Sequence, residues 1–281
     1  MGFFYVLGSV IFKVYRLFQA LSLDIAVGAV ILSTAMAKYY GVSLTWPVQL
    51  CLFIAVWLIY TFDHLMDGER ALQDQLSYRH LIHRCYRKQI VYSSIMSILV
   101  GTGSIFLLPT QVILWGVTAA AFIVIYFILV RFTVFWAKEV FVALGYTAGV
   151  FLAPMALLPQ WPNTGELWLV VGVFLVALVN LLLFSLYDYQ LDKQNGFHSL
   201  AIQLGAETTK GVIGILLTIT SLLIGWMLIN HPSDLMFWIL LMMTTSLVAI
   251  HLRPTVFQRR DNYRILGDGI FFLPLFYLIY A

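Results

Sequence analysis

Two pairs of aspartates have the spacing of metal ligands on a helix. Asp63 and Asp67 are four residues apart, and so are Asp188 and Asp192. Residues four apart lie on the same face of a helix, so each pair can present two carboxylates in one direction. Mg²⁺ binds through one or two carboxylates, keeps several waters and takes further ligands from substrate phosphates. The spacing therefore makes the four aspartates candidate ligands of Mg²⁺.

The elements that must carry these aspartates are membrane-spanning helices. The chain is 62% hydrophobic and 10% charged, with a mean hydropathy of +0.92, whereas soluble domains are about one-quarter charged. Lipid cannot satisfy backbone polar groups, and the chain lacks the alternating pattern of barrel strands. We therefore expect an all-α, multi-pass membrane protein in contact with membrane lipid, folded as a single domain over residues 1–281. Apolar stretches long enough to cross about 30 Å of hydrocarbon predict about nine transmembrane helices, at 20–40, 44–62, 89–109, 111–130, 139–158, 166–187, 211–230, 235–252 and 265–281.

The basic residues predict the orientation of these helices. With nine spans, every Lys and Arg except Lys38 falls on one side of the membrane, and cytoplasmic loops hold the excess of basic residues. Both aspartate pairs lie on that side, so we expect the active site to face the cytoplasm, in the cell inner membrane. The net charge of +3 is then a topology signal spread over several loops, and no nucleic-acid partner is expected.

Each aspartate pair alone is a weak signal, because an isolated pair at a helix end is more often a solvated surface feature. The two pairs share a side of the membrane, however, and ionisable residues at membrane depth usually mark function. The second pair also stands in a longer pattern, Tyr187-Asp188-Tyr-Gln-Leu-Asp192-Lys193-Gln-Asn-Gly196-Phe-His198-Ser199-Leu-Ala-Ile-Gln-Leu-Gly205.

This pattern resembles the UbiA superfamily of intramembrane prenyltransferases. The family shows Asp-x-x-x-Asp, a basic residue, a Gly four positions after the second Asp, Ser/Thr-Leu-Ala and a closing Leu-Gly. The chain matches without a gap at Asp188, Asp192, Lys193, Gly196, Ser199, Leu200, Ala201, Leu204 and Gly205. The resemblance implies a UbiA-like helical ring around a central cavity, where Mg²⁺ held by the four aspartates binds an isoprenyl diphosphate and promotes its ionisation to an allylic cation.

The first motif departs from the family, which usually shows Asn-Asp-x-x-Asp-x-x-x-Asp. Ile59 and Tyr60 stand in place of the first two residues, while Asp63 and Asp67 match the last two aspartates. The resemblance therefore implies that metal binding by this half is retained with one amide and one carboxylate fewer.

Basic and aromatic side chains near the motifs are candidates for substrate binding. Arg and Lys favour phosphate oxygens, and aromatic faces stabilise positive charge. The alternative is that the basic residues serve only topology and that the aromatic ones belong to the interfacial belt. The candidates are Arg79, Arg84, Arg131, Lys138, Lys193, Tyr60 and Tyr187.

Two further acids and several histidines lie near the motifs in the sequence. Asp24 has no obvious local partner, whereas Asp268 follows Arg264 by one helical turn, which favours an ion pair between them. Either acid is a candidate for the cavity wall. The spacing of His64, His80, His83 and His198 fits no zinc signature, so we expect these histidines to be solvated.

Three functions are compatible with these patterns. The leading hypothesis is a prenyltransferase that moves an isoprenyl group from its diphosphate to a lipophilic acceptor, aromatic acceptors included. The second is a terpene cyclase of the same superfamily, in which the cation closes on its own double bonds and the change at Ile59 and Tyr60 reflects a remodelled pocket. The third is a cation-coupled transporter or membrane binding protein. Transporter sites lie near the membrane midplane on broken helices, whereas these aspartates are predicted at helix ends.

Overall fold

The computed structural model describes residues 13–70, 78–132, 138–160, 162 and 164–281, and all regular structure in them is helical. The prediction of an all-α fold is thereby confirmed. The long helices are α2 (Leu23–Tyr39), α3 (Trp46–Arg70), α5 (Arg87–Ile105), α6 (Thr110–Phe132), α7 (Lys138–Ala156), α8 (Thr164–Tyr187), α11 (Ala206–Asn230) and α12 (Leu235–Leu252).

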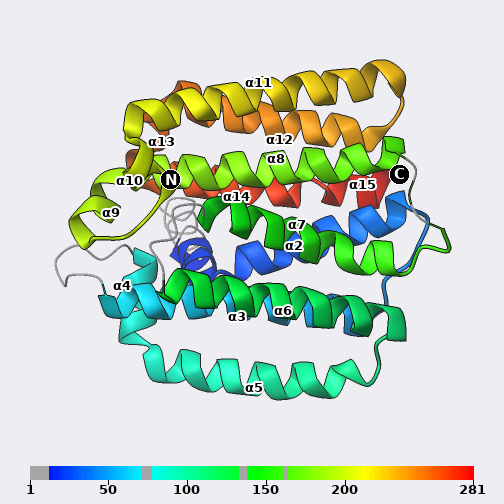
Figure 1. Cartoon of the computed structure of the whole chain (residues 1–281), viewed down its shortest axis with the longest axis horizontal. Helices are drawn as coiled ribbons and strands as arrows, with labels where there is room; N and C mark the ends of the chain where they lie inside the picture. The colour runs from blue at the N-terminus through cyan, green and yellow to red at the C-terminus, as the bar shows by residue number, and fades with distance from the viewer. Residues whose placement is uncertain (1–12, 71–77, 133–137, 161, 163) are drawn as a thin grey trace, which may run out of the picture.

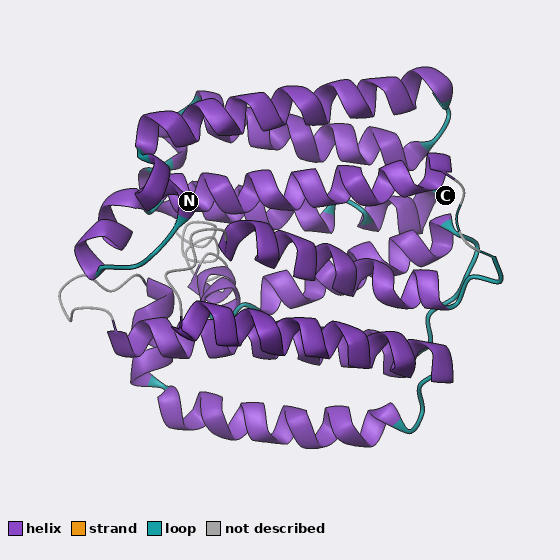
Figure 2. Cartoon of the chain, viewed as in Figure 1, coloured by secondary structure: helices purple, strands orange, loops and turns teal. Residues whose placement is uncertain are grey.

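Shorter helices follow several of the long ones. They are α4 (Tyr78–Cys85), α9 (Tyr189–Asn195), α10 (Leu200–Leu204) and α13 (Pro254–Phe257), and the C-terminal segment consists of η2 (Arg259–Asp261), α14 (Asn262–Gly269), η3 (Ile270–Phe272) and α15 (Leu275–Tyr280). The long helices lie side by side, and α4, α9, α10 and α13 gather at one end of the bundle, which we call the α9 end (Figure 1). The chain's C-terminus lies at the opposite end, where the connections are short loops (Figure 2).

Fewer of the described helices qualify as membrane spans than the hydropathy pattern predicts. Six described helices are long and apolar enough to cross a membrane, or seven if Lys13–Ala20 and α2 form one bent span. α5 is not among them and starts with Arg87 and Lys88, and α6 qualifies only as a shorter apolar helix over Thr110–Ile125. The predicted count of nine spans is therefore not confirmed by length and composition.

Two predicted spans are interrupted. The predicted span 20–40 contains a bend of 78° between Lys13–Ala20 and Leu23–Tyr39, and Ser22 at this bend has a φ of 57°. The predicted span 265–281 is broken into α14, η3 and α15, with Pro274 preceding the last helix. Proline lacks the backbone N–H that a continuous helix uses, which accounts for the second break.

Helix α8 is the central element of the bundle. It packs against α7, α11, α12 and α14. In its most apolar stretch of 18 residues, 72% is buried, against 28% in that of α11. Large side chains such as Leu169, Leu182 and Leu183 of α8 are almost fully buried. Helix α8 thus provides a rigid support for the residues at its C-terminal end, where the second aspartate pair begins.

Candidate functional site

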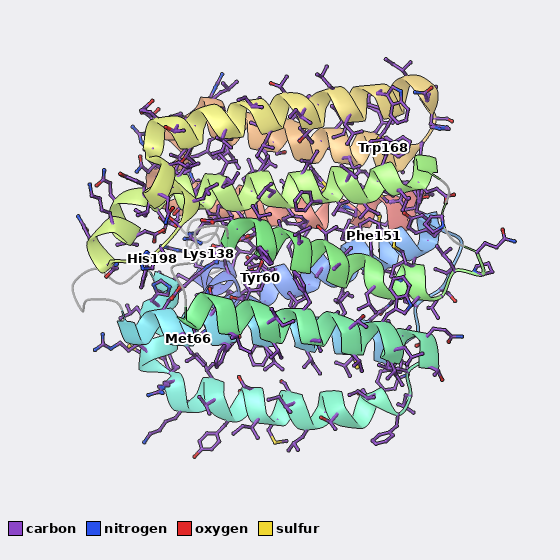
Figure 3. All side chains as sticks on the ribbon, in the orientation of Figure 1. Tyr60, Met66, Lys138, Phe151, Trp168 and His198 are labelled. Atoms are coloured by element: carbon purple, nitrogen blue, oxygen red, sulfur yellow. The ribbon has the colours of Figure 1, made fainter. Side chains whose placement is uncertain are left out.

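Both aspartate pairs line one cavity of about 200 Å³ at the α9 end. Its wall comes from α2, α3, α4, α7, α8, α9, α14 and η3 and from the segment between α9 and α10. Figure 3 shows Lys138 near this end and Tyr60 deeper in the bundle, with Phe151 and Trp168 toward the other end. The ionisable residues of the wall, histidines aside, are Asp63, Asp67, Asp188, Asp192, Asp268, Glu139, Arg79, Lys138 and Arg264.

The cavity follows the direction of the helices and changes from charged to apolar along them. On α8, Ala177, Leu181 and Phe184 line the wall one to three turns before Asp188. On α3, Ile59 lies one turn before Asp63. The carboxylates therefore lie toward the α9 end, and the space deeper in the bundle is suited to a hydrocarbon chain.

The second aspartate pair keeps helical geometry across a small break. Asp188 lies between α8 and α9, but its backbone N–H donates to the Phe184 oxygen at 2.9 Å, and the Asp192 N–H donates to the Asp188 oxygen at 2.8 Å. The i to i+4 relation that the sequence predicted is thus retained. Burial and the neighbouring Asp188 raise the pKa of Asp192 to about 6, although the positive charges of Lys138 and Arg264 act in the opposite direction.

The rest of the second motif shapes the segment that follows the pair. Gly196 and Gly205 have φ values of 67° and 82°, a backbone region where a residue with a Cβ is strained. Ser199 caps α10 by accepting from the Ile202 N–H at 3.3 Å. Glu139 of α7 accepts from the Leu200 N–H at 3.0 Å. These roles explain the residue types at the matched positions.

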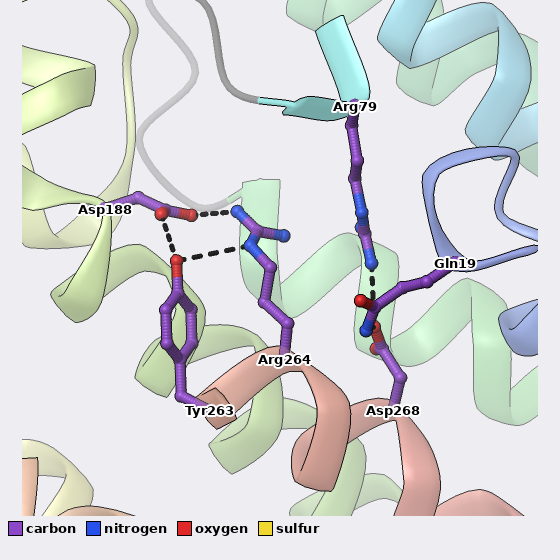
Figure 4. Close-up of polar contacts among 6 residues, drawn as sticks. All are labelled: Gln19, Arg79, Asp188, Tyr263, Arg264 and Asp268. Carbon is purple, nitrogen blue, oxygen red and sulfur yellow. Dashed lines mark hydrogen bonds and ion pairs between the residues drawn. The ribbon is translucent and has the colours of Figure 1, made fainter. Parts of the chain in front are cut away.

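Two residues of α14 that the sequence did not predict hold Asp188 (Figure 4). The Tyr263 hydroxyl donates to one Asp188 oxygen at 2.5 Å, and Arg264 forms an ion pair with the other. The Arg264 guanidinium also donates to the Tyr263 hydroxyl at 3.2 Å. No local signal identifies these partners, because they are separated from Asp188 by 75 and 76 positions.

The expected ion pair between Arg264 and Asp268 is wrong. Arg79 of α4 forms the ion pair with Asp268 at 2.7 Å, and the Gln19 amide donates to the same oxygen at 3.3 Å (Figure 4). Arg264 is instead drawn to Asp188 on the neighbouring helix. Asp268 and Arg79 both line the cavity, while Asp24 is fully buried beside them with both carboxylate oxygens lacking a hydrogen-bond partner among the described residues.

The remaining candidates divide between the cavity and other surfaces. Tyr60 and Lys138 line the cavity, and Lys138 interacts electrostatically with Asp63, Asp67 and Asp192. Arg131 lies at the end of α6, but its side chain is outside the described residues.

Three predicted substrate-binding residues are not among the described residues of the cavity wall. Arg84 lines a separate pocket with Leu65, Gly68, His83 and Arg87. Lys193 is exposed, and its Nζ lies 6.0 Å from the ring centre of Tyr189. Tyr187 points the other way because its hydroxyl donates to the Ile250 oxygen at 2.8 Å. Its ring stacks on Tyr263 at 4.4 Å, so it supports a residue that holds Asp188.

The expectation of solvated histidines is correct for the exposed His198 and wrong for His64 and His83, which are 8% and 1% exposed. The ring centres of His64 and His83 are 5.2 Å apart, and those of His64 and His80 are 5.9 Å apart. Burial, Arg264 and Arg79 lower the pKa of His80 to about 4, and burial lowers that of His83. These rings are therefore neutral at physiological pH.

The donor set of the cavity fits a hard divalent cation. No three His, Cys, Asp or Glu side chains in the described parts of the chain already converge as a metal cluster. Mg²⁺ does not require such a cluster, because it takes one or two carboxylates and completes its shell with water and phosphate oxygens. Asp63, Asp67 and Asp192 supply carboxylates to the wall. Burial and the neighbouring Asp188 together raise the pKa of Asp192, and a bound cation would offset both effects.

Comparison with known proteins shows the fold. No protein-family model and no curated protein sequence matches the chain. Among solved structures, an apo UbiA homologue from Aeropyrum pernix K1 matches with a TM-score of 0.67 at 13% identity, covering 92% of this chain and 98% of that one. A UbiA homologue from Archaeoglobus fulgidus bound to GPP and Mg²⁺ matches with a TM-score of 0.61 at 14% identity, covering 92% and 99%. A UbiA homologue from Archaeoglobus fulgidus bound to DMAPP and Mg²⁺ matches with a TM-score of 0.59 at 13% identity, covering 93% and 99%. The chain therefore has the fold of UbiA homologues, as the second motif predicted.

Proposed function

We propose that the chain is a Mg²⁺-dependent intramembrane prenyltransferase that ionises an isoprenyl diphosphate and transfers the prenyl group to a lipophilic acceptor. The observation that carries the proposal is the convergence of both aspartate pairs on one cavity that is charged toward the α9 end and apolar deeper in the bundle. This arrangement matches an amphipathic substrate with an anionic head. The binding of GPP or DMAPP with Mg²⁺ by solved structures of the same fold supports this ligand class.

Asp63, Asp67, Asp188 and Asp192 would hold the metal. When bound, Mg²⁺ supplies positive charge that stabilises the departing diphosphate. Tyr263 and Arg264 fix the direction of the Asp188 carboxylate, and Asp192, Asp63 and Asp67 bring three further carboxylates of the two motifs to the same wall. A carboxylate held in place by hydrogen bonds loses little conformational freedom when it binds.

Cationic side chains on the wall would bind the diphosphate itself. Lys138 lies close enough to Asp63, Asp67 and Asp192 to interact with all three, so its ammonium group is positioned beside the proposed metal site. Arg264 is the second candidate, since its guanidinium is already at the Asp188 carboxylate. Arginine and lysine both favour phosphate oxygens.

A terpene cyclase is the second candidate, and a specific observation favours it. Ile59 and Tyr60, the positions where the first motif departs from the UbiA pattern, form part of the cavity wall beside the apolar space. Bulky side chains at this place would fold a hydrocarbon chain back on itself. Aromatic faces such as Tyr60 would also stabilise an internal cation.

One assay separates the two reactions. Purified protein in lipid nanodiscs receives Mg²⁺ and geranyl, farnesyl or geranylgeranyl diphosphate, with or without an aromatic acceptor, and both diphosphate release and extracted products are measured. Release that depends on the acceptor supports the transferase. A cyclic terpene formed without acceptor contradicts it and supports the cyclase, and absence of turnover with every substrate contradicts both.

Variants test the metal-site assignment. We expect Asp63→Asn and Asp188→Asn each to lower turnover by at least about 100-fold, since even the loss of a group that only supports a metal ligand costs up to about that much. The control is Asp234→Asn, because Asp234 caps α12 at the other end of the bundle and asparagine caps a helix as well as aspartate does. Full turnover by both site variants would refute the assignment.

A further inference from the structure

A second cavity of about 60 Å³ lies beside the candidate site, between α3, α6 and α7. Four residues line both cavities: Ile59, Tyr60, Val142 and Tyr146. These side chains therefore form the partition between the two spaces. We call the smaller space the side pocket and the four residues the partition.

The side pocket is suited to hydrocarbon only. Its remaining described wall consists of Val56, Phe122, Ile123, Phe141 and Gly145. The polar side-chain atoms of its described lining are the Tyr60 and Tyr146 hydroxyls, and the Tyr146 hydroxyl is buried without a hydrogen-bond partner among the described residues. An apolar ligand is favoured there because a polar one would lose its hydration without compensation.

The partition lies deeper in the bundle than the proposed diphosphate position. Ile59 and Tyr60 precede Asp63 by about one turn of α3, which corresponds to about 5.4 Å along the axis. Val142 and Tyr146 lie one and two turns after Lys138 on α7. A substrate with its phosphates at the aspartates would therefore direct its hydrocarbon chain toward the partition.

We propose that Tyr60 and Tyr146 end the cavity on this side and set the longest isoprenyl chain that the site accepts, with the side pocket as the space that a longer chain enters once the partition is opened. The inference rests on the proposed function. It gives the departure from the UbiA pattern at Ile59 and Tyr60 a role in substrate length.

The first test is Tyr60→Ala, which removes the larger part of the partition on α3. Purified protein receives Mg²⁺ and an equimolar mixture of geranyl, farnesyl and geranylgeranyl diphosphate, and the consumption of each is measured. We expect the ratio of the longest to the shortest substrate consumed to rise by about tenfold or more, because even one methylene in an apolar pocket changes discrimination by about that factor. Tyr60→Phe keeps the ring and should keep the wild-type ratio.

The second test fills the side pocket from its far wall. A Cβ added at Gly145 meets no atom within 4 Å, so Gly145→Leu places its side chain into open space. The double variant Tyr60→Ala/Gly145→Leu should lose the gain of Tyr60→Ala. Gly225→Leu on α11 is the matched control, since a Cβ there also meets nothing within 4 Å and α11 contributes no described residue to either cavity. Tyr60→Ala/Gly225→Leu should keep the gain.

The outcomes separate this inference from the proposed function. An unchanged ratio in Tyr60→Ala with active wild type overturns the partition alone, as does a gain that Gly145→Leu does not reverse. If wild type consumes no diphosphate, the proposed function fails, and the affinities of thio-diphosphate analogues of the three chain lengths then decide the inference by the same ratios. Tyr60→Leu provides a milder opening if the alanine variant does not fold.

Discussion

Two side chains of α14 orient the carboxylate of Asp188. The Tyr263 hydroxyl and Arg264 each hold one carboxylate oxygen, and Tyr187 stacks on Tyr263 from behind. The carboxylate is thus oriented before any ligand arrives, and a metal bound there must share it with Arg264. The behaviour of Asp188 should therefore depend on residues that do not themselves bind metal.

This dependence predicts the effect of Tyr263→Phe. The variant keeps the ring stacked on Tyr187 and removes the hydroxyl that donates to Asp188, so we expect the Mg²⁺ concentration for half-maximal diphosphate release to rise by about 10-fold or more. Tyr187→Phe is the matched control, because its hydroxyl donates to the Ile250 oxygen instead. Equal effects of the two substitutions would show that only general packing matters.

At the residue scale, the sequence indicated the charged residues of the cavity wall better than the residues that contact them. Asp63, Asp67, Asp188, Asp192 and Lys138 could be found because charged groups near apolar helix ends are rare enough to indicate function. Their partners could not be found in the same way. The ion pair between Arg79 and Asp268 spans 189 positions, and only the tertiary fold brings the two residues together.

At the scale of elements, α14 must approach α8 closely for Arg264 to reach Asp188. Gly267 allows this approach. A Cβ on Gly267 would lie 2.4 Å from Asn180 Oδ1 and 2.7 Å from Phe184 Cε1, both on α8. The contact between Arg264 and Asp188 therefore depends on the absence of a side chain at Gly267 of α14.

We expect Gly267→Ala to destabilise the protein by about 1–3 kcal/mol, the usual cost of overpacking a buried contact. Thermal unfolding in detergent measures the effect. Gly269→Ala is the control within the same helix, because a Cβ there meets nothing within 4 Å and alanine favours a helix over glycine. A melting temperature for Gly267→Ala at or above that of Gly269→Ala would contradict the close-approach argument.

The long helices were predictable because each needs a continuous apolar stretch, and the observed bounds of α7, α8, α11 and α12 differ from the predicted ones by only a few residues. The short helices α4, α9 and α10 were not. They are too short for a periodic apolar pattern to stand out in the sequence, and caps and glycines set their ends, as Gly196 does at the end of α9 and Ser199 at the start of α10.

At the scale of the whole molecule, buried neutral histidines link stability to pH. Burial and the nearby arginines lower the pKa of His80 to about 4, whereas the pKa of a histidine in the unfolded chain is about 6.5. Between these values the unfolded chain binds the extra proton, so the free energy of unfolding falls as the pH is lowered from about 6.5 to about 4. His83 contributes in the same direction.

His80→Gln tests this link, because glutamine is neutral throughout the range. We expect the melting temperature in detergent to fall less, or to rise more, for the variant than for the wild type between pH 6.5 and 4.5. The comparison isolates His80, because the carboxyl of Asp192, with its pKa raised to about 6, gains a proton over the same interval and contributes in the opposite direction. His198→Gln is the control, since His198 is exposed. Parallel slopes for wild type and His80→Gln would show that His80 is protonated as easily in the folded protein as in the unfolded one.

We predict that the α9 end of the bundle faces the cytoplasm. Positive residues favour the cytoplasmic side, and α4 and the candidate site lie together at the α9 end, away from the C-terminus. Cys85 on α4 is exposed, so a membrane-impermeant maleimide should label it in inside-out vesicles and leave it unlabelled in intact cells.

Gln160→Cys in a Cys85→Ser background places an exposed thiol in the loop between α7 and α8, at the other end, and should show the reverse pattern. Cys51, which is half-buried on α3, is replaced by serine in both proteins. Labelling of Cys85 in intact cells would place the aspartates outside the cell, contrary to a site that draws its diphosphate from the cytoplasm.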